Sequence, residues 1–137
     1  MDWKNFIVVG ENIHCTRIVK RGGKRALARP DGSEAVTFNF RGEDRLLPVP
    51  ANWGQFSPAF EQGNIKHAAL GIYQAVNASG ADQQTGMDYL CWMAERQIKG
   101  GAVYLDVNVD EYSNDAAEAR DAMVFLASFL SERYEIS

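Results

Sequence analysis

Two polar side chains interrupt an apolar segment toward the C-terminal end of the chain. The segment GGAVYLDVNVDEYS spans residues 100–113, and the polar residues are Asp106 and Asn108. Its nearly continuous apolar character after a Gly-Gly pair predicts a buried parallel strand. Residues two apart on a strand share a face. A carboxylate accepts two N–H donors and an amide donates and accepts, which together fit a planar heterocycle with an aminopyrimidinone edge.

A second polar cluster follows the first apolar run of the chain, residues 6–9. Gly10 ends this run, and Glu11, Asn12 and His14 come directly after it. Polar clusters that end two strands of one sheet converge on a binding site. The structural alternative is that Asp106 and Asn108 only cap the next helix or complete the strand end, and that His14 is a satisfied structural histidine. The spacing alone leaves both interpretations open.

The remaining elements are predicted from periodicity and turn signals. Apolar residues at helical spacing predict helices over residues 58–77, 82–98 and 115–133. Ser57 before Pro58 is typical of an N-cap followed by proline in the first turn. Pro30-Asp31-Gly32 lies between two β-prone arms and predicts a hairpin. Residues 15–79 therefore form an insertion with a hairpin and an extra helix.

This order of elements predicts an α/β fold in one domain over residues 1–137. Two parallel strands, three helices and the inserted β-hairpin correspond to the N-terminal portion of a (β/α)8 TIM-type barrel. Two strands do not complete such a sheet. We therefore expect further strands, which a longer chain, a second copy of this chain or a different chain would supply. Because strand-to-helix loops emerge at the active-site rim, we expect the hairpin there, as a lid or docking surface outside the core.

Charge and composition exclude several classes of function. The formal net charge of −4 argues against a general nucleic-acid binder, despite a basic stretch between residues 17 and 29. The first apolar run is too short for a signal peptide or a membrane span, so we expect a cytoplasmic protein without membrane contact. Cys15 and Cys91 are far apart in sequence, which suggests neither a disulfide framework nor a zinc site. We expect both thiols to be buried, and no bound metal.

The two segments together resemble a known enzyme family. VVGENIH, followed later by AERQIKGGAVYLDVNV, is similar to the opening of the pterin-binding barrels. Within them the chain most resembles methyltetrahydrofolate-dependent methyltransferases, including the folate domain of methionine synthase and the corrinoid iron-sulfur protein methyltransferase. The resemblance covers residues 6–14 and about 85–110, and corresponds to the first third to two fifths of such a barrel.

The resemblance implies a function in one-carbon metabolism. A methyl group would pass from methyltetrahydrofolate to a corrinoid on a partner protein, with Asp106 and Asn108 lining the pterin pocket. Glu11 and Asn12 or His14 would lie at its floor or rim, although the family usually has an asparagine where this chain has His14. Later strands supply further pterin contacts in the family, and no catalytic residue is assigned here.

Two other functions are compatible with the residues. A dihydropteroate synthase-like condensing enzyme would bind a pterin pyrophosphate and use the basic loop at residues 22–29 as a phosphate contact, although DVN replaces that enzyme's glycine-rich sequence. A non-catalytic half-barrel would instead assemble with a partner chain, or be an inactive truncated product. An exposed parallel edge strand in the structure would indicate such a half-barrel.

Overall fold

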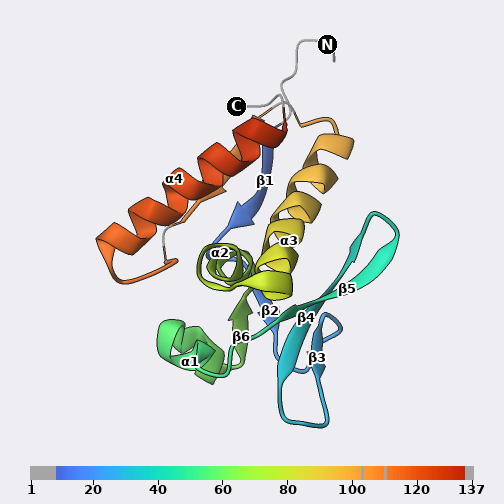
Figure 1. Ribbon diagram of the computed structural model, residues 1–137, viewed down its shortest axis with the longest axis vertical. Helices are drawn as coiled ribbons and strands as arrows, with labels where there is room; N and C mark the ends of the chain where they lie inside the picture. Colours follow the sequence, from blue (N-terminus) through green and yellow to red (C-terminus); the bar gives the residue numbers. More distant parts are fainter. Residues whose placement is uncertain (1–8, 103, 110, 135–137) are drawn as a thin grey trace, which may run out of the picture.

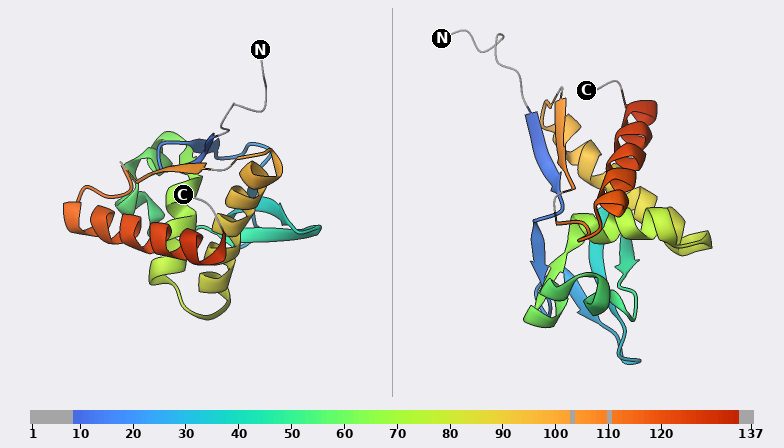
Figure 2. Two further views of the ribbon diagram at one scale, coloured as in Figure 1. Left: turned by 90° about the horizontal axis from the view of Figure 1, so that it is seen from above. Right: turned by 90° about the vertical axis from the view of Figure 1, so that its left-hand side faces the viewer.

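Helices cover one face of a small parallel sheet. The structure is a computed structural model and describes residues 9–102, 104–109 and 111–134. The sheet pairs β1 (Val9–His14) with β7 (Tyr104–Asn108). On its covered face lie the longer helices, α2 (His67–Asn77), α3 (Gly80–Lys99) and α4 (Ala116–Arg133) (Figure 2).

The segment between β1 and α2 forms two further small sheets beyond the carboxyl end of β1 (Figure 1). In one, β2 (Ile18–Lys20) pairs antiparallel with β6 (Asn64–Lys66). The other is an antiparallel meander of β3 (Ala26–Ala28), β4 (Glu34–Phe40) and β5 (Glu43–Pro48). Two short helical turns follow, α1 (Trp53–Phe56) and the 3-10 helix η2 (Pro58–Gln62).

The fold is thus a small mixed α/β domain with one parallel strand pair. The predicted parallel pairing of the first and last strands is confirmed for the described residues, whereas residues 6–8 lie outside them. The parts of the chain that the structure describes form no barrel, and their parallel sheet has two strands. None of the described helices is long and apolar enough to cross a membrane.

Two of the three predicted helices are confirmed, and the third is wrong in its first half. The helices expected at 82–98 and 115–133 are α3 and α4. Residues 58–77 instead form η2, then β6, and only then α2. Ser57 makes no capping hydrogen bond, and Gly63 ends η2 with φ near +89°. A left-handed residue cannot continue a helix, so the chain turns there into a strand.

The predicted hairpin is present, but its expected position outside the core is wrong. Asp31 Oδ1 accepts a hydrogen bond of 2.9 Å from the Ser33 N–H in the turn between β3 and β4. Val36 is fully buried and Phe38 is 5% exposed, and both belong to the main hydrophobic core. The insertion is therefore part of the core, because the apolar residues of β4 lie on the face toward α3.

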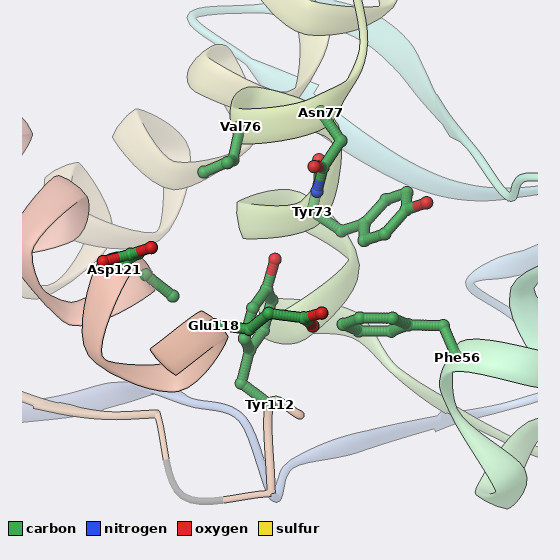
Figure 3. Close-up of a pocket in the computed structure, with 8 residues that line it drawn as sticks. Phe56, Tyr73, Val76, Asn77, Tyr112, Glu118 and Asp121 are labelled. Atoms are coloured by element: carbon green, nitrogen blue, oxygen red, sulfur yellow. The ribbon is translucent and has the colours of Figure 1, made fainter. Parts of the chain in front are cut away.

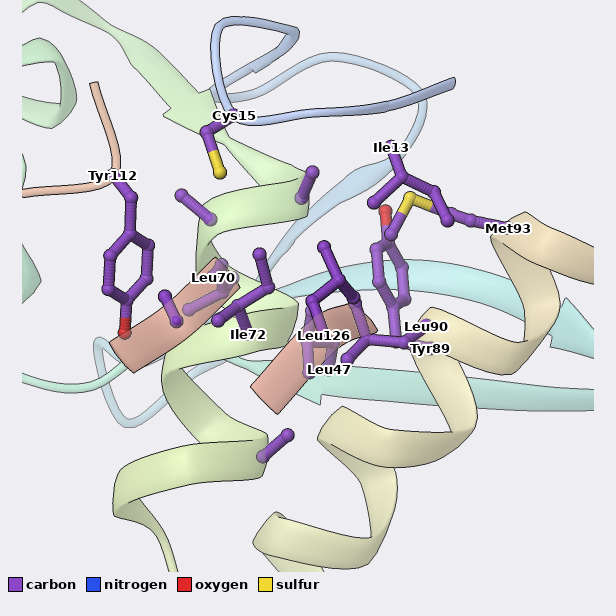
Figure 4. Close-up of a cluster of buried hydrophobic side chains, with 14 of the residues drawn as sticks. Ile13, Cys15, Leu47, Leu70, Ile72, Tyr89, Leu90, Met93, Tyr112 and Leu126 are labelled. Atoms are coloured by element: carbon purple, nitrogen blue, oxygen red, sulfur yellow. The ribbon is translucent and has the colours of Figure 1, made fainter. Parts of the chain in front are cut away.

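The core joins the parallel sheet, the helices and the insertion in one cluster (Figure 4). It includes Ile13 of β1, Leu70 of α2, Leu90 of α3 and Leu126 of α4, each at most 1% exposed. Burial of a leucine or isoleucine side chain stabilises a fold by roughly 1.5–3 kcal/mol. This shared core fixes the carboxyl ends of β1 and β7 relative to the helices.

Asp115 is expected to stabilise α4 as its N-cap. Its Oδ1 accepts hydrogen bonds from the Ala117 N–H at 2.8 Å and the Glu118 N–H at 3.3 Å. We expect Asp115→Ala to lower the free energy of unfolding by about 1 kcal/mol, because two helix N–H groups lose their acceptor. Asp115→Asn keeps an acceptor oxygen and should retain most of the stability. Urea unfolding of both variants measures this, and equal losses would contradict the capping role.

Candidate functional site at the carboxyl ends of β1 and β7

The strand register brings the two polar clusters predicted from the sequence side by side. His14 is the pairing partner of Asn108, and Ile13 that of Val107. Beyond the ladder, the Cys15 N–H donates a 2.9 Å hydrogen bond to the Asn108 carbonyl. Both strands therefore end at the same edge, as the prediction of a common site requires.

Side chains alternate between the two faces of β7, so the face that carries the candidate site is exposed. Leu105 and Val107 are half-buried and pack against the core, whereas the Asp106 side chain is 55% exposed. On β1 the alternation is the same, with Ile13 1% exposed beneath the sheet and His14 on the opposite side with Asp106. The prediction that the aliphatic residues face the helices and the carboxylate faces away is confirmed.

His14 and Asp106 approach each other closely across the strand pair. His14 Nε2 lies 3.4 Å from Asp106 Oδ2, a distance suited to an ion pair when the imidazole is protonated. This distance exceeds the usual 2.7–3.2 Å of an N–H···O hydrogen bond, and Nε2 is buried without a hydrogen-bond partner. A buried polar nitrogen normally has such a partner. The Asp106 carboxylate is thus the accessible group of the pair, and the buried His14 Nε2 lies beside it.

The other predicted site residues lie on the same two strands. Glu11 and Asn12 are inside β1, so the expectation that they follow the strand is wrong; β1 extends to His14. The register shifts between Gly10 and Ile13, so the ladder between β1 and β7 is irregular at this polar segment. Their side chains lie outside the described part of the structure. Asn108 is half-buried at the end of β7 and takes part in local contacts.

An ion pair that the sequence did not reveal ties the insertion to this edge. Lys66 Nζ of β6 lies 3.0 Å from Glu111 Oε2, in the loop that follows β7. Glu111 has φ near +69°, a left-handed conformation that few non-glycine residues adopt. The insertion is therefore held at the carboxyl end of the parallel strands, which agrees with its expected place at the rim.

A buried polar chain, also missed from the sequence, lies beneath the insertion. Arg25 donates to the Tyr89 hydroxyl at 2.7 Å, and this hydroxyl lies 2.8 Å from His67 Nδ1. Because arginine only donates, the phenol proton is left to donate to His67 Nδ1. Burial and the nearby Arg25 charge lower the pKa of His67 to about 4. In the sequence Arg25 belonged to the basic stretch between residues 17 and 29, and no pattern marked His67.

Within the described residues, no group of three or more His, Cys, Asp or Glu side chains is placed to hold a metal ion. A carboxylate, an imidazole and an amide lie at the edge, and these groups can form hydrogen bonds and exchange protons. Comparisons with models of protein families, with curated proteins and with solved structures find no match to this chain.

Proposed function

We propose that the chain is the pterin-binding part of a methyltransferase that moves a methyl group from methyltetrahydrofolate to a corrinoid protein. The observation that carries the proposal is the meeting of His14 and Asp106, 3.4 Å apart, at the carboxyl ends of two adjacent parallel strands. Ligands of α/β sheets bind at this end of the strands. Both segments resemble pterin-binding barrels, and this resemblance is the reason for proposing a pterin as the ligand.

The chemistry assigns roles to Asp106 and Asn108. The Asp106 carboxylate accepts two N–H groups from the aminopyrimidinone edge of the pterin, and the Asn108 amide pairs with a neighbouring ring atom. Methyl transfer from N5 requires this nitrogen to become a good leaving group, and polar groups around the ring favour its protonated form. The corrinoid belongs to a partner protein and supplies the cobalt that accepts the methyl group.

The contacts of the basic stretch favour this function over a pyrophosphate-binding condensing enzyme. Arg25 is turned inward to Tyr89 and the Thr37 carbonyl, and Arg29 donates to Ser33 Oγ at 2.8 Å. These guanidinium groups are used within the fold instead of forming a phosphate loop. We place the protein in the cytoplasm, where its two buried, free cysteines remain reduced.

The two-stranded parallel sheet supports one further proposal, assembly with additional strands. Parallel sheets usually have more strands and are covered on both faces, whereas here the described helices cover one face. A second chain or a second copy that supplies strands would add the later pterin contacts. In a non-catalytic half-barrel the same assembly would form without binding a pterin.

Neutralising Asp106 is expected to weaken pterin binding without loss of the fold. In calorimetric titrations with 5-methyltetrahydrofolate, Asp106→Asn should cost about 1.5–3 kcal/mol of binding, the scale of a charge-assisted hydrogen bond. Asn108→Ala should weaken binding less. Each titration is made on this chain and on its assembly with any strands that complete the sheet.

The control is Glu43→Gln, which removes one exposed carboxylate from β5, far from this edge in the sequence. It should bind the folate as the wild type does, and thermal melts should show that all variants are folded. Equal affinity in the wild type, Asp106→Asn and Asn108→Ala would mean that the polar pair only completes the strand end.

A further inference from the structure

A pocket opens on the helix side of the sheet, between α1, α2, α4 and the loop that follows β7 (Figure 3). Its volume is about 320 Å³, within the range of small-molecule sites. Its lining combines three aromatic residues with two carboxylates: Phe56, Tyr73, Val76, Asn77, Tyr112, Glu118, Asp121 and Ala122. None of the residues predicted for the pterin site lines this pocket.

The aromatic side of the pocket is a packed wall. The Phe56 ring centre lies 4.8 Å from that of Tyr73 and 5.3 Å from that of Tyr112, with the planes inclined by 57° and 68°. Trp53 supports this wall from behind, stacked on Phe56 at 5.2 Å and fully buried. These ring contacts bring the aromatic residues together as one surface of the pocket.

The side of the pocket that α4 forms is acidic, and both of its carboxylates belong to exposed residues. Glu118 and Asp121 lie three residues apart on α4, and this spacing places them on one face of the helix. Ser113 Oγ donates a 2.8 Å hydrogen bond to Glu118 Oε2, which orients that carboxylate. Among the residues that the structure describes, neither carboxylate is in an ion pair, and no lysine or arginine lines the pocket.

We propose that this pocket binds a small organic ammonium ion. Aromatic faces attract a cation through their quadrupole, and carboxylates that line the same pocket add a direct charge interaction. An anionic ligand would be repelled by both carboxylates, and a neutral apolar ligand would desolvate them without compensation. The alkyl groups of an organic ammonium ion cover Val76 and the ring edges while its charge meets the acidic side.

This site is independent of the pterin site in both residues and position. Asp106 faces away from the helices, whereas the pocket lies between them. Binding of an ammonium ion therefore tests this proposal alone.

Calorimetric titration of the whole chain with two ammonium probes, choline and n-butylammonium, tests the proposal. The neutral comparison is 3,3-dimethyl-1-butanol, which has the shape of choline without its charge. We expect saturable binding of at least one ammonium probe. If choline binds, 3,3-dimethyl-1-butanol should bind about tenfold more weakly than choline or not at all, because it lacks the charge that the pocket attracts.

Variants that neutralise carboxylates test whether the ammonium ion binds in this pocket. The double variant Glu118→Gln, Asp121→Asn should raise the dissociation constant about tenfold, as expected when both carboxylates lose their charge. Glu132→Gln, an exposed carboxylate in the last turn of α4, changes the net charge without touching the pocket and should bind as the wild type does. Tyr73→Leu should weaken binding several-fold, with thermal melts as the folding control.

Three results would overturn the proposal. The first is that folded wild-type protein gives no saturable binding with either ammonium probe. The second is that the neutral alcohol binds as tightly as choline. The third is that the double variant keeps the wild-type affinity, since the ammonium ion would then bind elsewhere.

Discussion

Lowering the pH from 6.5 to 4 is expected to destabilise the protein by about 3 kcal/mol, because His67 takes up a proton more readily in the unfolded chain. The His67 side chain is buried, and burial together with the charges of Arg25, Arg17 and Arg96 lowers its pKa from 6.5 to about 4. The unfolded chain binds the proton more tightly than the folded chain in this range. The stabilising contribution is therefore complete above pH 6.5 and is lost as the pH falls toward 4.

The hydrogen-bond chain explains why a neutral imidazole belongs at this position. Arg25 donates to the Tyr89 oxygen, and the Tyr89 hydroxyl donates to His67 Nδ1. Burial raises the pKa of Tyr89 to about 12, so the phenol keeps its proton. A protonated His67 would place a second N–H donor against that hydroxyl and a second positive charge near Arg25.

Urea unfolding at several pH values from 7.5 to 4.5 measures this effect. His67→Gln should flatten the acid-dependent loss of stability, since an amide does not titrate. Tyr89→Phe is the matched control: it removes the hydroxyl but keeps the buried imidazole, so its stability is lower while the dependence on pH remains. If His67→Gln and the wild type lose stability in parallel toward acid, His67 is not the titrating group.

Gly86→Val is expected to lower the free energy of unfolding by about 3 kcal/mol, at the upper end of overpacking effects. Gly86 lies where α3 crosses α2. A Cβ added there would lie 2.6 Å from the Ala75 nitrogen, 2.8 Å from Gln74 Cβ and 2.9 Å from the Gly71 carbonyl oxygen. Two of these atoms belong to the α2 backbone, which must move as a unit.

Gly100→Val is the matched control for this substitution. Gly100 follows α3 with φ near −78°, and an added Cβ would lie no closer than 3.4 Å to a neighbouring atom. We expect it to change the stability by less than about 1 kcal/mol, as for surface positions. Chemical denaturation compares the two variants, and similar losses would mean that the helix crossing tolerates a side chain.

Local patterns predicted those parts of the fold that depend on nearby residues. The apolar stripes of α3 and α4 follow the helical period, and the run before Asp106 has strand character, so all three elements were predictable. The convergence of His14 with Asp106 was also predictable, because the carboxyl ends of neighbouring parallel strands meet at one edge.

The features that the sequence did not reveal depend on contacts between residues far apart in the chain. The helical spacing within residues 58–77 concealed β6, whose strand partner is β2, more than forty residues earlier in the chain. Gly63 marks the break, but a lone glycine inside a helical pattern is a weak signal. Similarly, Arg25 and His67 become partners only through Tyr89, which lies on a third element.

The pocket of the ammonium site was hidden from the sequence for the same reason. Its aromatic wall joins Phe56, Tyr73 and Tyr112 from three separate segments, and each aromatic residue by itself fits a core position. The two carboxylates of α4 are typical of the first half of a helix, where acidic residues favour the dipole. Only their position in one pocket with the rings indicates a site.

Backbone amide NMR of the isotope-labelled chain, titrated with 5-methyltetrahydrofolate, tests most directly whether the carboxyl ends of β1 and β7 bind a pterin. The proposed site predicts shifts that saturate with ligand and concentrate on His14, Cys15, Asp106 and Asn108, and that Asp106→Asn suppresses. Shifts that saturate at other elements, or no saturable shifts in the folded chain and in its completed assembly, would contradict a pterin site at this edge.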